Sequence, residues 1–227
     1  MVLLRTYMEI IKIALSMQHA ENIIAEVKAR DAAIGRDMSR WWMYENHIRA
    51  AANVAKTVAS KIGGMDENRA YICALLHDVC RTNERQEARF HGITGYEKLV
   101  DKDETVARSA LLHMFLWNKL PPYEKVAQMF FDNKKDYDFV ANYIHNTKTT
   151  DVDLLIQLAD NLSNKDGFVT IEQRAKDLSE RRGIKLDNDW LDSRYRLKSY
   201  FDKKVGGNIY DLFTKNHTYN LNISRER

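Results

Sequence analysis

Histidine and aspartate side chains recur in three separated segments of the sequence, and these residue types bind transition metals. His47 lies in ENHIRAAANVAKTVA, His77 and Asp78 close the apolar run AYICALLHD, and Asp160 lies in DLLIQLADNLS. Mixed imidazole and carboxylate ligands suit iron, manganese, zinc, cobalt or nickel better than calcium or magnesium. Each side chain alone is more typical of a hydrogen-bonded core or surface residue, so the metal hypothesis depends on their combination.

Helices are expected to position these side chains, because apolar residues recur at helical spacing through most of the chain. The apolar face of residues 45–62 predicts a helix that ends at a glycine pair. A second helix begins after Asp66 as the N-cap and carries His77 and Asp78 at its C-terminal end. The helix DVDLLIQLADNLS surrounds Asp160 with leucines, so this carboxylate needs a partner, because an unpaired buried charge is costly.

The pattern between these helices predicts further elements. Residues 82–95 break the apolar spacing and contain two glycines, which indicates a loop. The segment DETVARSALLHMFLWNKLPP predicts a helix that runs to its proline pair and points His113 inward. Two helices are expected at about 123–131 and 136–146. The segments TIEQRAKDLSERRG and NDWLDSRYRLKSYFDKKVGG predict helices that end at glycines, before a polar tail expected to fray.

The N-terminal stretch MVLLRTYMEIIKIALSM is apolar but is interrupted by charged residues. It is therefore expected to be neither a signal peptide nor a membrane span. We expect an initial helix that reaches about Arg30 and packs on the domain or on a second subunit. Binding of this amphipathic segment to a membrane surface is the less favoured alternative.

The composition fits an all-α protein of ordinary globular character. Of 227 residues, 44% are hydrophobic and only 2 are proline, which favours long helices over a turn-rich β architecture. The 35 basic and 32 acidic residues are interspersed, so the charge pattern gives no reason to expect nucleic-acid binding. Cys73 and Cys80 lie too far apart on one predicted helix to form a disulfide, and this favours a cytoplasmic location.

The order of the candidate ligands resembles that of the HD-domain superfamily of metal-dependent phosphohydrolases. In that superfamily a histidine on one helix is followed by a His-Asp pair on a later helix and by a distant aspartate. The matching positions here are His47, the pair His77 and Asp78, and Asp160, with LLHD and LAD as local contexts. The sequence is also similar to a group of uncharacterised bacterial HD proteins. The resemblance implies an HD-domain-like multi-helix bundle, here with an extra N-terminal helix and a helical C-terminal tail.

The resemblance divides the chain into three expected parts. Residues 1–44 form an N-terminal helical segment that packs on the core. Residues 45–165 form the metal-binding core, with a helical insert at 114–150 that shapes the pocket or acts as a lid. Residues 166–227 form a helical C-terminal extension of the same domain.

The resemblance also implies two divalent transition-metal ions. The first would be held by His47, His77, Asp78 and Asp160. Asp78 would bridge to a second ion held by His91 and His113, which occupy the places where binuclear members of the superfamily carry extra ligands. His145 competes with His113 for this role and could equally be a polar pocket residue; we favour His113.

Basic residues near the expected site could bind the substrate phosphates. Arg81 lies three residues after Asp78, where it could serve as a catalytic and substrate-binding residue, and Lys165 could share the binding role. Arg85 and Arg89 extend a stripe at four-residue spacing, although glutamates among them fit an ordinary solvated face equally well. The aromatic residues before His47 could stack on a base, but packing in the core is the favoured interpretation.

These observations predict hydrolysis of a phosphoester or phosphoanhydride in a small, nucleotide-like molecule by a metal-activated water. No membrane partner is expected, and a homo-oligomer is compatible with the sequence. No GYP signature is present, which argues against a cyclic-dinucleotide phosphodiesterase. The alternative is a non-catalytic, metal-containing ligand-binding or sensor protein with the same fold, since a fold alone does not fix a function.

Overall fold

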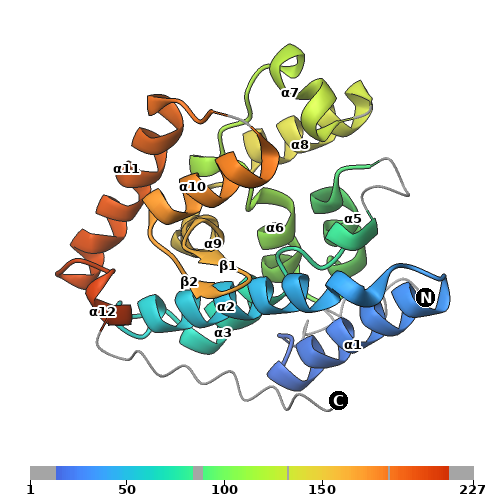
Figure 1. Cartoon of the computed structure of the whole chain (residues 1–227), viewed down its shortest axis with the longest axis horizontal. Helices are drawn as coiled ribbons and strands as arrows, with labels where there is room; N and C mark the ends of the chain where they lie inside the picture. Colours follow the sequence, from blue (N-terminus) through green and yellow to red (C-terminus); the bar gives the residue numbers. More distant parts are fainter. Residues whose placement is uncertain (1–13, 84–88, 132, 184, 215–227) are drawn as a thin grey trace, which may run out of the picture.

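The computed structural model of the chain describes residues 14–83, 89–131, 133–183 and 185–214. Helices dominate these ranges and are arranged as a bundle (Figure 1). The prediction of an all-α, multi-helix bundle is therefore confirmed.

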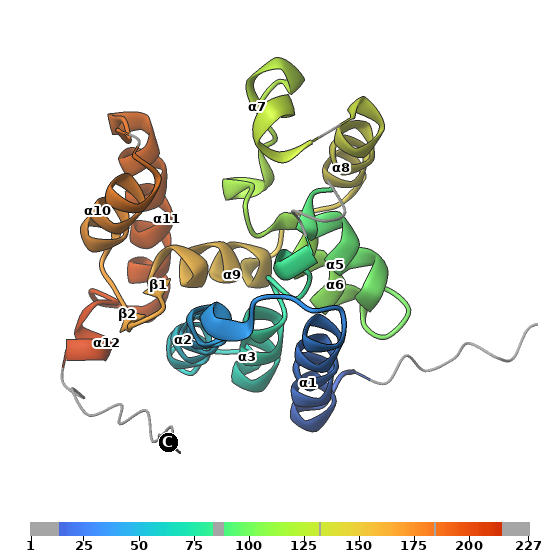
Figure 2. The ribbon, with the colours of Figure 1, turned by 45° about the vertical axis from the view of Figure 1, so that its right-hand side comes forward.

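Helix α9 (Asp151–Asn161) lies at the centre of the bundle (Figure 2). It contacts α2 (Trp41–Ala59), α3 (Glu67–Leu75), α6 (Glu104–Leu112) and α11 (Asn188–Val205). Most of its side chains are buried, as expected for a helix that is apolar on nearly every face. A polar residue on α9 is therefore placed in the interior of the protein.

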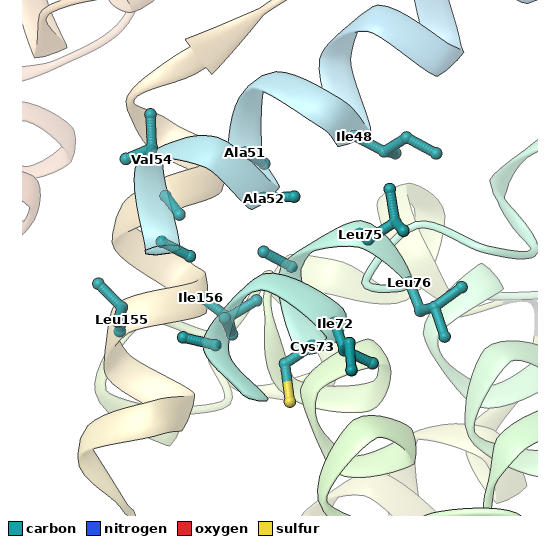
Figure 3. Close-up of a cluster of buried hydrophobic side chains, with 14 of the residues drawn as sticks. Ile48, Ala51, Ala52, Val54, Ile72, Cys73, Leu75, Leu76, Leu155 and Ile156 are labelled. Atoms are coloured by element: carbon teal, nitrogen blue, oxygen red, sulfur yellow. The ribbon is translucent and has the colours of Figure 1, made fainter. Parts of the chain in front are cut away.

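Small residues allow α2 and α3 to pack closely against each other. Ala51 and Ala52 of α2 are fully buried, and the larger side chains of Ile48 and Leu75 fill the space beside them (Figure 3). Full burial of a leucine or isoleucine side chain contributes about 2 kcal/mol to folding. This packing fixes α2 relative to the chain that follows α3.

The ends of α2 and α3 agree only in part with the bounds predicted from the sequence. The predicted helix at 45–62 exists but begins earlier, at Trp41, and ends at Ala59. Asp66 caps α3 as expected, because its carboxylate accepts hydrogen bonds from the backbone N–H groups of Asn68 and Arg69. The prediction that α3 continues through the His-Asp pair is wrong, since α3 ends at Leu75.

Helix α1 (Met17–Ala33) packs on the core through the buried residues Ile23 and Val27. It begins after Ser16, whose hydroxyl accepts a hydrogen bond from the backbone N–H of His19. Residues 14–16 are not helical, so the expected initial helix is shorter at this end than the apolar pattern predicts. The rest of the N-terminal stretch, residues 1–13, lies outside the described residues.

The prediction of a loop over residues 82–95 is wrong in its last part, because α5 (His91–Leu99) begins there. The two glycines that indicated a loop lie inside this helix and face α6. A Cβ added at Gly92 would lie 3.0 Å from the backbone oxygen of Ala110, and one at Gly95 would lie 3.2 Å from the Ala110 Cβ. These glycines therefore allow two helices to approach closely and do not form a turn.

Replacing Gly92 by alanine is expected to lower the free energy of unfolding by about 1–3 kcal/mol. The new Cβ would also lie 2.5 Å from the buried ring of Phe90, and this clash outweighs the usual gain of about 1 kcal/mol from alanine in a helix. Urea denaturation measures the effect. Gly63→Ala is the matched control, because nothing lies within 4 Å of its added Cβ. Equal stability of the two variants would contradict this account.

Helix α6 ends well before the proline pair, so the predicted helix is too long. It stops at Leu112, with His113 as the C-cap, and is followed by a short 3-10 helix, η3 (Leu116–Asn118). Trp117 and Asn118 have positive φ angles of 60° and 50°, which an α-helix does not allow. The prediction that His113 points inward is confirmed, since its side chain is buried.

The predicted helices after the prolines are present. They are α7 (Tyr123–Phe130), α8 (Lys134–Asn146), α10 (Ile171–Arg182) and α11. The short helices η1 (Met38–Arg40), η2 (Arg81–Asn83) and α12 (Asp211–Thr214) were not predicted. A two-stranded antiparallel hairpin, β1 (Ser163–Asn164) and β2 (Gly167–Phe168), was not predicted.

The C-terminal helices end as the sequence predicts. α10 and α11 stop at Gly183 and Gly206, whose φ angles of 64° and 76° favour glycine. The polar tail over residues 215–227 lies outside the described residues. Within the described ranges, the helices lack the combination of length and apolar character that crossing a bilayer requires.

Candidate metal centre

His47 and Asp160 face each other from the two central helices. His47 lies on α2 and Asp160 lies near the C-terminal end of α9. The Nε2 atom of His47 is 3.1 Å from Oδ1 of Asp160 and 3.8 Å from Oδ2 of Asp78. Asp160 thus has the partner that a carboxylate on an apolar helix requires.

His77 and Asp78 lie in the turn that follows α3, and both side chains are buried. The Nε2 atom of His77 is 3.6 Å from Oδ2 of Asp78 and 3.8 Å from Oδ1 of Asp160. Leaving the helix before the pair turns both side chains towards α2 and α9. The early end of α3, at Leu75, therefore brings the His-Asp pair into the site.

His91 and His113 approach Asp78 from the opposite side. His91 is the first residue of α5, and His113 is the C-cap of α6. Their Nε2 atoms are 3.0 Å and 3.2 Å from Oδ1 of Asp78, and 3.2 Å from each other. The close packing of α5 on α6 through glycine brings these two imidazoles together.

The carboxylate of Asp78 lies between two sets of imidazoles. Its Oδ2 atom faces His47 and His77, and its Oδ1 atom faces His91 and His113. Two groups of ligand atoms are close enough to hold an ion, namely His47 with His77 and Asp78, and Asp78 with His91 and His113. One carboxylate shared by two groups is the arrangement that a bridged pair of ions needs.

Backbone carbonyls fix the tautomers of two of these histidines. The Nδ1 atom of His77 is 2.6 Å from the carbonyl oxygen of Ala74, and that of His113 is 2.9 Å from the carbonyl oxygen of Ala110. A carbonyl only accepts hydrogen bonds, so Nδ1 must carry the proton in each ring. The neutral imidazole then presents the lone pair of Nε2 to the site, which is the form that binds a metal.

The geometry around Oδ1 of Asp78 fits a metal ion. Two ligand atoms at about 2.0–2.1 Å from one ion lie about 2.9 Å apart at a right angle and about 3.4 Å apart at the tetrahedral angle. The separations among Asp78 Oδ1, His91 Nε2 and His113 Nε2 are 3.0–3.2 Å, within that interval. Among the described side chains, His77 Nε2 is buried without a hydrogen-bond partner, although it points at two carboxylates. A cation would satisfy this atom.

The protonation states also suit a metal. Burial lowers the pKa of His77 to about 4, so its imidazole is neutral at physiological pH. Burial acts to raise the pKa of Asp78, but the charge of Arg81 and the surrounding imidazoles hold that pKa well below its ordinary value. Burial also acts to raise the pKa of Asp160, but His47 and Arg174 lower that pKa below its ordinary value. The site thus combines the neutral imidazole of His77 with ionised carboxylates.

His145 does not join these groups. It is exposed on the last turn of α8, and neither group of described ligand atoms contains it. The structure brings all six predicted ligands together without it: His47, His77, Asp78, His91, His113 and Asp160. Their roles as ligands remain a prediction.

Replacing His113 by alanine is expected to remove one bound ion per chain and leave the other in place. The first group of ligands lies on the other side of Asp78 and does not include His113. His145→Ala is the matched control and is expected to keep the wild-type ion content. Mass spectrometry of metals in the purified variants gives the result, and an ion lost from the His145 variant would reverse the assignment.

A cavity of about 400 Å³ opens beside the metal ligands. Its walls contain five cationic side chains and only two carboxylates. The residues that line it are Arg40, Met43, Tyr44, His47, Asp78, Arg81, Thr82, Asn164, Lys165, Arg174, Asp177 and Arg181. The excess of positive charge makes this cavity suited to an anion.

The two predicted substrate-binding residues line this cavity, whereas Arg89 of the predicted arginine stripe does not. Arg81 and Lys165 both line it, and Arg81 also contacts Oδ2 of Asp78 at 3.1 Å. Arg89 instead pairs with Glu97 and Asp136, and Arg85 lies outside the described residues.

The aromatic residues before His47 fulfil different roles. Trp41 is buried in the core, and Tyr44 donates a hydrogen bond to the backbone oxygen of Asp78, which supports the packing interpretation for these two. Trp42 is half-exposed, and the ammonium of Lys165 lies 5.8 Å from its ring centroid. Trp42 is therefore the most exposed of these three aromatic side chains, while Tyr44 is the one that lines the cavity.

Three cationic cavity residues were missed by the sequence reasoning: Arg40, and the pair Arg174 and Arg181. Arg174 and Arg181 lie on α10, after the metal-binding core expected at residues 45–165. The seven-residue spacing of Arg174 and Arg181 places them on one face of a helix, and this spacing is the only pattern in the sequence that could have indicated a shared binding role. The position of α10 over the site depends on tertiary packing, which no local pattern indicates.

Comparison with known proteins agrees with these observations. The family model described as HD domain matches residues 44–165, which is more than half of the chain. No curated protein and no solved structure shows significant similarity to the chain.

Proposed function

The chain belongs to the HD-domain family, and from this premise we propose that it is a metal-dependent phosphohydrolase acting on a small, nucleotide-like phosphate compound. One observation carries the proposal: the carboxylate of Asp78 lies between two sets of imidazoles, and the adjoining cavity has a cationic wall. Candidate ligands for metal ions and cationic groups suited to phosphate thus lie side by side, which supports the proposal.

The ligand assignment follows the two sides of Asp78. His47, His77, Asp78 and Asp160 would hold a first ion, and Asp78, His91 and His113 would hold a second. When bound, such ions act as Lewis acids on phosphoryl oxygens and lower the pKa of a coordinated water. The residue types favour iron, manganese, zinc, cobalt or nickel.

The chain's own residues would bind and orient the phosphate. Arg81 is about one-third exposed, so its guanidinium can reach both Asp78 and the cavity. A guanidinium there stabilises negative charge that develops on phosphoryl oxygens during attack by water. Lys165 lies on the same wall and adds a second cation of similar exposure.

The size of the cavity supports a small substrate. A volume of about 400 Å³ lies in the range of pockets that bind small molecules and cofactors. The accessible ring of Trp42 near Lys165 could contact a base, which favours a nucleotide over an inorganic phosphate compound.

The proposal is tested by hydrolysis assays on chelator-treated protein reconstituted with each candidate metal. A panel of nucleoside phosphates is incubated in ¹⁸O-labelled water, and the label is expected in the released phosphate because water attacks phosphorus. Activity should disappear with chelation and return with metal. Turnover that is unaffected by chelation would contradict the proposal. Two bound ions and tight nucleotide binding without any turnover would instead favour a non-catalytic ligand-binding protein.

A further inference from the structure

Helix α10 contributes two arginines to the cavity, although it lies outside the residues that match the family model. Arg174 and Arg181 line the same cavity as Arg81 and Lys165. They lie two turns apart on one helix face, so they extend the cationic wall beyond the groups next to Asp78. The cavity therefore has more guanidinium groups than one phosphate group requires.

Arg174 is a buried cation with incomplete pairing. Its side chain is only 12% exposed, and its Nη2 atom lies 3.3 Å from Oδ1 of Asp160. Its second carboxylate contact, with Asp177, is long at 3.7 Å, and its Nε atom is buried with no hydrogen-bond partner among the described residues. A buried guanidinium with an unused donor is costly unless an anion completes its pairing.

The carboxylate that Arg174 contacts is also a candidate metal ligand. Oδ1 of Asp160 is shared between Arg174 and the imidazole of His47. An ion held by Asp160 would compete with Arg174 for that oxygen, and two positive charges would face each other. An incoming anion would offset this repulsion and satisfy the guanidinium.

The three arginines are close enough to influence one another. Arg81, Arg174 and Arg181 line one cavity, so the positive charge of each lies in the field of the other two. Like charges that affect each other across a cavity form a site that a polyanion neutralises better than a single anion.

We propose that Arg174 and Arg181 form a second anion subsite beside the metal centre, which binds the phosphate group next to the one that is attacked. The preferred substrate then carries at least two linked phosphate groups. This inference rests on the proposed hydrolase function. A guanidinium binds two oxygens of one phosphate, so Arg81 and Lys165 suffice for the first group and the α10 pair for the second.

The test compares two non-hydrolysable probes by calorimetric titration of metal-loaded protein. Methylphosphonate represents one phosphate group, and methylenediphosphonate represents two linked groups. We expect the diphosphonate to bind about tenfold more tightly, and Arg174→Gln and Arg181→Gln each to remove most of this preference. Affinity for methylphosphonate should change less than about threefold. Ion content measured after each titration shows that the probe has not removed the metal.

The exposure of two other side chains on α10 separates loss of the subsite from loss of the fold. Arg181 is 47% exposed, so its replacement is compatible with folding even if loss of the buried Arg174 is not. Lys176→Gln on the same helix is the matched control, because Lys176 is 78% exposed and does not line the cavity. An unchanged preference in Arg181→Gln, or equal losses for both probes, would overturn the subsite. If the subsite is overturned but metal-dependent hydrolysis persists, the proposed function stands. If the protein prefers the diphosphonate but hydrolyses no substrate, the subsite is supported and the proposed function is contradicted.

Discussion

Replacing Asp78 by alanine is expected to abolish the binding of both ions and to lower hydrolysis by at least about a thousandfold. Each oxygen of this carboxylate faces a different pair of imidazoles, so no other side chain contributes to both groups of ligands. Metal ions stabilise charge in such transition states by several kcal/mol, and about 4 kcal/mol corresponds to a thousandfold in rate. Metal content and turnover are measured on the same preparation, with helical content followed by circular dichroism.

The matched control is Asp136→Ala. Asp136 is also a buried carboxylate, and it pairs with Arg89. Its loss should reduce stability but leave the ions in place, because it is not among the candidate ligands. An Asp78 variant that folds and retains two ions would show that Asp78 does not bridge them.

Replacing Asp153 by alanine is expected to lower the free energy of unfolding of the metal-free protein by about 3–5 kcal/mol. The buried carboxylate accepts hydrogen bonds from Nε and Nη2 of Arg108 at 2.8 Å and 2.6 Å, and from the backbone N–H of Thr150 at 2.7 Å. Its removal leaves the guanidinium of Arg108 largely buried without its charge partner. Urea denaturation measures the loss.

This ion pair also matters for the site, because it joins the helices that carry two of the candidate ligands. Arg108 lies on α6, whose C-cap is His113, and Asp153 lies on α9, which carries Asp160. Asp138→Ala is the control, because its pair with Lys134 is exposed and should contribute less than about 1 kcal/mol. Similar losses in the two variants would contradict the structural role of Asp153.

The candidate ligands could be found from the sequence because their order and local contexts are encoded in short segments. LLHD follows an apolar helix, and LAD lies within a helix that is apolar on nearly all faces. Their convergence on Asp78 could not be derived from spacing, since it depends on how α5 and α6 pack. The glycines of α5 show why: Gly92 and Gly95 resemble turn residues in a local pattern, but each serves a close contact with Ala110.

The end of α6 was misplaced for a similar reason. The apolar pattern continues past His113, and the prolines provide the next obvious stop. The chain instead leaves the helix early, and the backbone N–H of Trp117 donates a hydrogen bond to the side-chain oxygen of Gln157 on α9. Gln157 also donates hydrogen bonds to the Leu112 carbonyl and to Asn118. This buried network, formed across 40 residues of sequence, determines where the helix ends.

The metal content of the wild-type chain tests the central claim most directly. Protein is purified without chelator, both in air and under anaerobic conditions, and ions are counted by mass spectrometry. The geometry around Asp78 predicts close to two divalent transition-metal ions per chain in at least one preparation. A single ion would contradict the binuclear site and remove His91 and His113 from the ligand set. A chain that binds no ion under either condition, and takes up none on addition of metal, would contradict the proposed hydrolase.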